Sequence, residues 1–103
     1  MNVHDTILEM ATKARAAAAG LAKKTTDEKN AALLAIADSL EKNRAAIVAA
    51  NDIDLAHAKE AGISPSMLDR LTLTPARFDA MVAGVRHVAT LPDPVGETIW
   101  TRE

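Results

Sequence analysis

The sequence has no cysteine and no tyrosine, and a single phenylalanine and a single tryptophan among its 103 residues. The lack of cysteine excludes a disulfide framework, a thiolate zinc site and a cysteine nucleophile within these residues. Aromatic side chains usually give the largest single burials in a core, and only Phe78 and Trp100 are available here. Much of the 49% hydrophobic content is alanine, which brings little apolar area. The composition therefore predicts a thin core, as expected of a segment that packs against further polypeptide.

Long apolar runs and an excess of one charge are also lacking. No stretch approaches the roughly eighteen consecutive apolar residues needed to cross a bilayer. The opening MNVHDTILEM lacks the basic region and apolar run of a secretory signal. The formal net charge is −2 with acids and bases interspersed, so no basic stripe is available to neutralise phosphates. These absences predict a cytoplasmic protein that binds neither nucleic acid nor membrane.

Apolar residues recur at helical spacing along two N-terminal stretches. Thr25 and Glu28 have capping-box spacing, in which a hydroxyl and a carboxylate bond the first free backbone amides of a helix. One helix is therefore expected over residues 3 to 23, and a second from Thr25 onward. The inner face of the first comprises Val3, Ile7, Ala11, Ala14, Ala18 and Leu21, and that of the second Leu33, Ile36, Ala37 and Leu40.

Two asparagines predict further helix starts, because asparagine is a favoured N-cap residue. Asn43 is expected to cap a short third helix that runs through Ile47 and Val48. Asn51 is expected to cap a fourth helix, which stops at Gly62 because glycine readily takes the left-handed conformation after a helix end.

The pairs Ser64–Pro65 and Thr74–Pro75 each combine an N-cap with a first-turn proline. The first pair predicts a short helix through Leu71. The second predicts a long helix with an internal glycine, Gly84, which costs about 1 kcal/mol relative to alanine and is explained by close packing at that point. The apolar side of this helix comprises Phe78, Met81, Val82, Val85 and Val88.

Prolines 92 and 94 end the last predicted helix and force an extended path. Residues 98–101 have strand character, and no second strand is visible for them to pair with, which indicates a missing partner. The sequence therefore predicts an all-α chain of five to six helices with a short extended C-terminal tail. Residues 1–91 are expected to form a helical segment, and residues 92–103 an extended connection.

The most suggestive polar cluster comprises Asp54, His57 and Glu60, which share one face of a predicted helix and could in principle hold a metal. The di-metal motif of helical bundles needs partners on other helices, so a solvated polar face is the favoured interpretation. His4 and His87 suit helix ends, and the four glycines are isolated rather than grouped in a phosphate loop. These residues alone predict no catalytic, cofactor-binding or metal-binding site.

The stretch DRLTLTPARFDAMVAGVRHVATLPDPVGE resembles the N-terminal region of the γ-glutamyl phosphate reductases, also called glutamate-5-semialdehyde dehydrogenases. The earlier run KNAALLAIADSLEKNRAAIVAANDIDLAHAKEAGIS resembles the preceding helices of this family in the same order. The similarity extends from about residue 7 to residue 97. Its most specific part is the ordered set Asp69-Arg70-Leu71, Leu73-Thr74-Pro75, Met81, Gly84 and Leu91-Pro92-Asp93-Pro94-Val95-Gly96.

This resemblance implies the N-terminal helical part of an α/β aldehyde dehydrogenase-like fold. It implies an enzyme of proline biosynthesis that reduces L-glutamyl 5-phosphate with NADPH to L-glutamate 5-semialdehyde, through a thioester on a cysteine thiolate. The cofactor and catalytic domains of the family lie mostly downstream, so no catalytic or cofactor-binding residue carries over. NADP(H) is expected to bind the full-length enzyme and not this chain, which is expected to be inactive alone and to pack against the remainder of the same polypeptide.

The alternative is a self-standing helical dimerisation or protein-interaction module. Such a module would bury its alanine-rich faces by dimerising, or would present a groove to a partner helix. An isolated reductase segment is also expected to self-associate, through the surfaces that its usual neighbours would cover.

Overall fold

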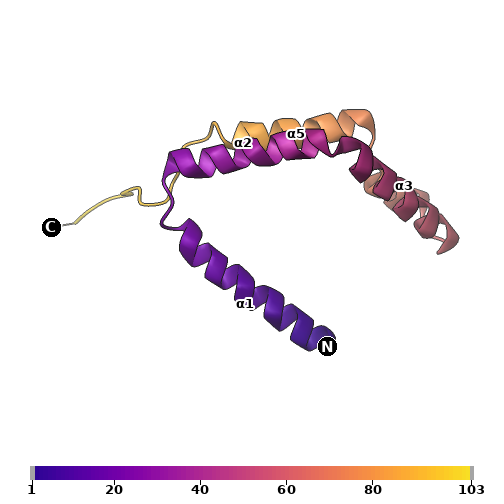
Figure 1. Cartoon of the computed structure of the whole chain (residues 1–103), viewed down its shortest axis with the longest axis horizontal. Helices are drawn as coiled ribbons and strands as arrows, with labels where there is room; N and C mark the ends of the chain where they lie inside the picture. The colour runs from indigo at the N-terminus through magenta and orange to yellow at the C-terminus, as the bar shows by residue number, and fades with distance from the viewer. Residues whose placement is uncertain (1, 103) are drawn as a thin grey trace.

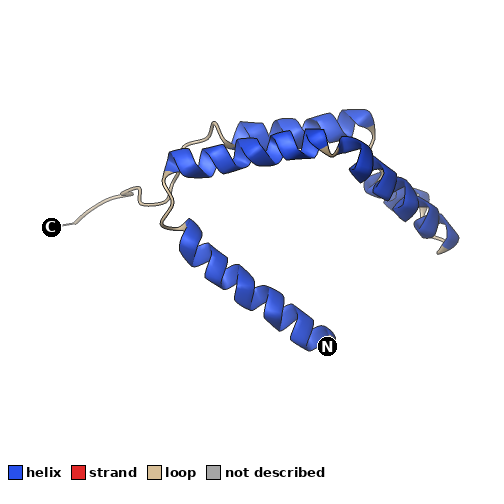
Figure 2. Ribbon diagram, viewed as in Figure 1, coloured by secondary structure: helices blue, strands red, loops and turns tan. Residues whose placement is uncertain are grey.

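The computed structural model describes residues 2–102, and in this range the chain forms five α-helices and no β-strand (Figure 2). The all-α prediction is therefore confirmed, whereas Met1 and Glu103, the ends of the two predicted segments, lie outside the described residues. The helices are α1 (Val3–Leu21), α2 (Thr26–Lys42), α3 (Arg44–Glu60), α4 (Pro65–Leu71) and α5 (Pro75–Val88).

The five helices are arranged as a central pair with an arm at each end (Figure 1). α2 and α5 lie side by side, α3 and α4 pack together and extend from one end of this pair, and α1 projects from the other end. The radius of gyration is 18.8 Å and the extents are 63 × 37 × 27 Å, whereas a compact domain of this length has a radius of gyration of about 13 Å. Much of the surface of each helix is therefore left without a neighbour.

The core lies between α2 and α5 and is small, as the composition predicts. Ala37 of α2 is fully buried against Phe78 and Val82 of α5. Phe78 supplies the largest buried side chain, and the apolar side predicted for the last helix is indeed the side that carries it. Partly buried residues surround this cluster, namely Leu40, Ile47, Val48, Leu73 and Val85.

Three helix starts are capped as the sequence predicts. The amide of Glu28 donates to Thr25 Oγ1 at 3.1 Å, and the amide of Thr25 donates to Glu28 Oε1 at 3.2 Å, which completes the capping box of α2. Ser64 and Thr74 accept from the backbone amides of the residues three positions on, at 3.3 and 3.1 Å. Each cap satisfies a donor that has no partner within its helix.

The predicted third and fourth helices are in fact one continuous helix, α3, and the prediction that Asn51 caps a helix is wrong. Asn51 lies in the middle of α3 with only 7% of its surface exposed. Its side chain reaches the turn between α4 and α5: Nδ2 donates to the carbonyl of Leu71 at 2.8 Å, and Oδ1 accepts from the amide of Leu73 at 2.9 Å. An asparagine side chain can bond backbone groups at a helix start or in a distant segment. Here it bonds the distant backbone groups of Leu71 and Leu73.

Asn43 does precede α3, but its side chain does not cap it. Nδ2 of Asn43 instead donates back to the carbonyl of Ser39, at the end of α2, at 2.8 Å. The corner between α2 and α3 is thus held by the preceding helix, which explains how two helices follow each other with one residue between them.

The two glycine predictions have opposite outcomes. Gly62 ends α3 with φ +74°, as expected of a residue in the left-handed conformation. The close packing predicted at Gly84 is wrong, because a Cβ built at this position meets no atom within 4 Å. The strand-like residues 98–101 form an extended tail without a sheet partner in the described part of the chain.

Candidate interaction surfaces

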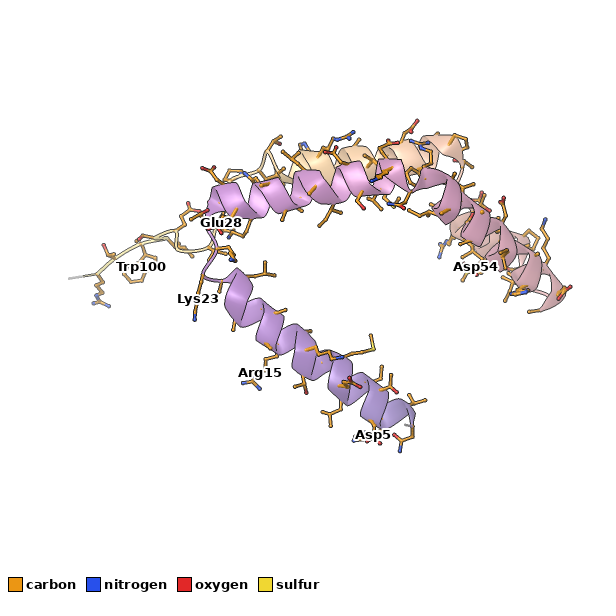
Figure 3. All side chains as sticks on the ribbon, in the orientation of Figure 1. Asp5, Arg15, Lys23, Glu28, Asp54 and Trp100 are labelled. Atoms are coloured by element: carbon orange, nitrogen blue, oxygen red, sulfur yellow. The ribbon has the colours of Figure 1, made fainter. Side chains whose placement is uncertain are left out.

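The polar residues singled out in the sequence are not brought together by the fold. The three histidines are exposed and lie on different helices, His4 on α1, His57 on α3 and His87 on α5. Within residues 2–102, no group of three or more histidine, cysteine, aspartate or glutamate residues is close enough to hold a metal ion. The face shared by Asp54, His57 and Glu60 is exposed on α3, where Figure 3 labels Asp54.

Asp93 forms the best-built polar cluster that joins distant parts of the chain. Its Oδ2 accepts from Thr26 Oγ1 at 2.9 Å and lies 2.5 Å from Lys29 Nζ, while Oδ1 accepts from the amide of Val95 at 3.0 Å. The side chains of Lys29 and Asp93 are only 21% and 16% exposed. This cluster, called the Asp93 latch below, ties the segment after α5 to the first turns of α2.

The latch also changes the titration of its carboxyl group. The hydrogen bond from Lys29 lowers the pKa of Asp93 below its ordinary value, and the bonds from the Val95 amide and the Thr26 hydroxyl lower it further. All three donors stabilise the charged form, so Asp93 is a carboxylate at neutral pH. The acid is therefore a structural anion and is unsuited to general acid catalysis.

An apolar groove of about 400 Å³ lies beside the latch, where α2 meets the segment after α5. Its walls are Leu33, Val88, Leu91, Pro92 and Pro94, with Lys29, Asn30 and Asp93 at its polar edge. Such a mostly apolar groove suits a hydrophobic side chain from a packing partner better than it suits a polar substrate.

Arg44 holds the corner between the central helix pair and the α3–α4 arm. It donates to both carboxylate oxygens of Glu41, at 3.0 and 3.2 Å, and also pairs with Asp79 of α5. Its guanidinium carbon lies 4.4 Å from the centroid of the Phe78 ring, a cation–π distance. The hydrogen bonds from Glu41 and Asp79 raise the pKa of Arg44, which stays charged.

The surface of α1 has the least cover. Every residue of α1 is exposed, and more than half of the surface of each of its large apolar side chains is open: Val3 is 80%, Ile7 57%, Met10 61% and Leu21 57% exposed. In Figure 3 the helix stands apart from the others, with its side chains free on all sides. The tail shows the same feature, since Ile99 is 93% and Trp100 71% exposed.

Two of these features, the latch and the Asn51 contact, are not predicted by the sequence. Thr26 and Asp93 are 67 positions apart, and Asn51 and Leu73 are 22 apart. The only local sign of the latch is that Asp93 lies between two prolines. The prolines restrict the backbone, and the Asp93 carboxylate accepts from the amide of Val95, two residues on.

No protein-family model matches the chain. Its sequence is 49% identical over 98 residues to the γ-glutamyl phosphate reductase of Geobacillus thermodenitrificans, an alignment that covers 93% of this chain and 24% of that protein. Its fold is similar to the crystal structure of γ-glutamyl phosphate reductase from Thermotoga maritima, with a TM-score of 0.85, 45% sequence identity, and coverage of 93% of this chain and 24% of that one.

The chain thus spans about a quarter of the length of the relatives that it matches. Both similarities cover 93% of the chain, and the sequence comparison and the fold comparison point to the same kind of enzyme. Among the described residues, every helix is too short or too polar to span a membrane. The resemblance predicted from the sequence is confirmed: the chain is homologous to a quarter-length segment of the γ-glutamyl phosphate reductases.

Proposed function

We propose that this chain is the N-terminal helical portion of a γ-glutamyl phosphate reductase, a cytoplasmic oxidoreductase of proline biosynthesis. The full-length enzyme would reduce L-glutamyl 5-phosphate with NADPH, releasing phosphate and giving L-glutamate 5-semialdehyde. The observation that carries this proposal is the 49% identity over 93% of the chain, together with a shared fold at a TM-score of 0.85.

The role proposed for these residues is that of a scaffold that packs against the remainder of the same polypeptide. Three features support this role: the open shape, the apolar groove beside the Asp93 latch, and the exposed apolar side chains of α1 and the tail. Monomeric proteins seldom leave such surfaces in contact with water. The latch would then set the direction in which the chain leaves α5 toward the rest of the enzyme.

The nicotinamide cofactor does not fit the residues present here. A dinucleotide is usually held by closely spaced glycines between a strand and a helix, where the backbone approaches the pyrophosphate. The four glycines of this chain are far apart, and a Cβ added at any of them meets no atom within 4 Å. We therefore assign NADP(H) to the remainder of the enzyme and propose that the 103-residue chain is inactive alone.

The first experiment is to determine the size of the native product, by immunoblotting source cells with an antibody against this chain. A band several times larger than 10.9 kDa is expected, since the relatives are about four times as long. In parallel, the purified chain is expected to show no NADPH oxidation with an acyl phosphate. A single band at 10.9 kDa, or reproducible turnover by the purified chain, would contradict the proposal.

A self-standing helical interaction module is the second candidate, and the complete exposure of α1 favours it. The immunoblot separates the two candidates. If the native product is the short chain, the chemistry of the full-length relatives is absent from it, and α1 becomes the main surface available for a partner.

A further inference from the structure

The α3–α4 arm is fastened to the central helix pair at both of its connections. Where α3 begins, the guanidinium of Arg44 pairs with one carboxylate of α2 and with one of α5. Where α4 ends, the Asn51 side chain bonds the carbonyl of Leu71 and the amide of Leu73 at 2.8 and 2.9 Å. Leu73 also packs against the buried cluster between α2 and α5. The arm therefore cannot turn relative to the central pair without breaking several of these contacts.

The other arm, α1, has no comparable fastening. Its side-chain bonds are local, and they comprise the Asn2 cap, the bonds from the hydroxyls of Thr6 and Thr12, and the pair of Lys13 with Glu9. In the part of the chain that the structure describes, no hydrogen bond or salt bridge joins α1 to another helix. The covalent link to α2 is the one connection that carries α1 (Figure 1).

This link comprises residues 22–25, and its bonds belong to one helix or to the other. The amides of Lys23 and Lys24 donate to carbonyls in the last turn of α1 at 3.2 and 3.1 Å, whereas Thr25 belongs to the capping box of α2. Lys24 and Glu28 do pair across the junction at 3.6 Å, but more than half of each side chain is exposed. Exposed pairs contribute little, so the backbone at the junction is free to change direction.

Open space lies beside the link. A hollow of about 410 Å³ separates the end of α1 from the start of α2, and Leu21 at its edge is 57% exposed. α1 can turn toward α2 without displacing a buried side chain, because neither α1 nor the first turns of α2 bury one. α1 has 19 residues and a length of about 28 Å, so a turn of about 30° moves its far end by about 14 Å. The hollow is lined by Leu21, Lys24, Glu28, Lys29, Ala31 and Ala32.

We propose that α1 is a hinged arm, which turns as a rigid helix about residues 22–25 while α2, α3, α4 and α5 move together as one body. Hinges are commonly a few residues between elements that absorb the change in backbone angles, and segments with few buried contacts are the ones that move. The segment that covers α1 would then also set its direction. In the full-length enzyme of the proposed function that segment belongs to the remainder of the polypeptide. The hinge itself does not rest on the reductase assignment, because it follows from contacts within this chain.

The absence of cysteine allows spin labels to be placed at chosen pairs of positions. The pair Ala11→Cys and Ala35→Cys reports the distance between α1 and α2, and the pair Ala56→Cys and Ala35→Cys reports that between α3 and α2. The second pair is the matched control, because all three alanines are exposed and helical. Double electron–electron resonance on the chain at micromolar concentration measures both. The α1–α2 distance distribution is expected to be at least about twice as wide as the α3–α2 distribution.

A third pair distinguishes a turning helix from an unfolded one. His4→Cys and Ala18→Cys both lie within α1, and an intact helix places them about 21 Å apart along its axis. This distribution is expected to be narrow, because residues 14–19 are alanine apart from Arg15 and alanine has the highest helix propensity. Circular dichroism of each labelled chain shows whether its helices are retained.

Three results would overturn the proposal. An α1–α2 distribution as narrow as the α3–α2 distribution would show that α1 is fixed. An α3–α2 distribution as wide as the α1–α2 distribution would show that α2 and α3 are not one body. A wide distribution within α1 would show that the arm is unfolded rather than hinged. None of these results bears on the reductase assignment, which the immunoblot tests separately.

Discussion

α1 and α5 are similar in sequence pattern and opposite in environment. Both are amphipathic helices with an internal glycine and a run of apolar residues at helical spacing. In α5, Phe78 and Val82 are buried against α2, whereas α1 has no buried residue. Amphipathic spacing therefore indicates that a helix has a face to cover, and it does not indicate whether the covering partner is within the same chain.

The difference also distinguishes two sources of helical stability. α5 is held by the core, by the pair between Arg44 and Asp79, and by its Thr74 cap. The bonds that hold α1 are local: its backbone bonds, the Asn2 cap, the bonds from the Thr6 and Thr12 hydroxyls to carbonyls four residues earlier, and the pair of Lys13 with Glu9 at 2.8 Å. Exposed pairs of this last kind contribute little. The two helices should therefore respond very differently to equivalent substitutions.

The largest expected effect is the loss of the Phe78 ring. Phe78→Ala should lower the free energy of unfolding of the α2–α5 pair by about 3–5 kcal/mol, because it removes the largest fully buried side chain and leaves a cavity. Ile7→Ala on α1 should change it by less than about 0.5 kcal/mol. Urea unfolding at low protein concentration, followed by circular dichroism, measures both. Equal losses for Phe78→Ala and Ile7→Ala would show that α1 is held by tertiary packing as α5 is.

A smaller loss is expected at Asn51. Asn51→Ala removes both hydrogen bonds to the turn between α4 and α5 and leaves the carbonyl of Leu71 and the amide of Leu73 without that partner. The expected cost is about 2 kcal/mol in the free energy of unfolding. Asp52→Ala is the matched control, since Asp52 is the exposed neighbour on the same helix. If both variants unfold at the same urea concentration, the Asn51 contact does not hold the α3–α4 arm in place.

Substitution of two glycines by alanine should have effects of opposite sign. Gly84→Ala should stabilise α5 by up to about 1 kcal/mol, because the position is helical and a Cβ there meets no atom within 4 Å. Gly62→Ala should destabilise the chain by about 1 kcal/mol, because φ is +74° and a side chain disfavours that conformation. Thermal unfolding compares the two. A destabilising effect of Gly84→Ala would show that another segment packs against α5 at this position.

The smallest expected effect is at the Asp93 latch, and it should be local. Asp93→Asn leaves an acceptor for the Val95 amide and removes the charge that pairs with Lys29. The tail should then move more freely, and the fluorescence anisotropy of Trp100, the only tryptophan, should fall. Glu97→Gln, an exposed change in the same segment, should leave the anisotropy unchanged.

The pH dependence of the latch follows from the lowered pKa of Asp93. A carboxyl whose folded pKa is below its unfolded value stabilises the fold at any pH above the unfolded value, and that contribution is lost as the pH falls through the folded pKa. The ordinary value for Asp93 is 3.8, so wild-type anisotropy should stay constant from neutral pH down to about that value and fall below it. A loss of anisotropy well above that pH would show that protonation of Asp93 does not release the tail.

The local features of the fold could be predicted from short stretches of sequence. The starts of α2, α4 and α5 follow from Thr25, Ser64 and Thr74, and the end of α3 follows from Gly62. Caps and left-handed glycines act within one helical turn, so a few neighbouring residues contain the whole cause. The resemblance to the reductases was likewise readable from residues in order along the chain.

The site residues could not be predicted in the same way. Asparagine is a favoured N-cap residue, so the local sequence at Asn51 predicts a helix start. The structure places residues 71–73 beside α3, where the Asn51 side chain bonds the carbonyl of Leu71 and the amide of Leu73 from the middle of the helix. Asp93 meets Thr26 and Lys29 only because α5 runs back along α2. The glycine at position 84 predicts a closely packed neighbour, and the structure shows open space there instead.

The sequence by itself thus determined the starts of α2, α4 and α5 and the end of α3, how little core the chain can build, and which enzymes it is related to. These properties depend on local backbone chemistry, on composition and on shared residues. Only the tertiary structure decided which apolar faces are covered. The apolar face of α5 packs against α2, whereas that of α1 is exposed within residues 2–102. Burial is a relation between distant segments, and the spacing within one helix carries no information about where its partner lies.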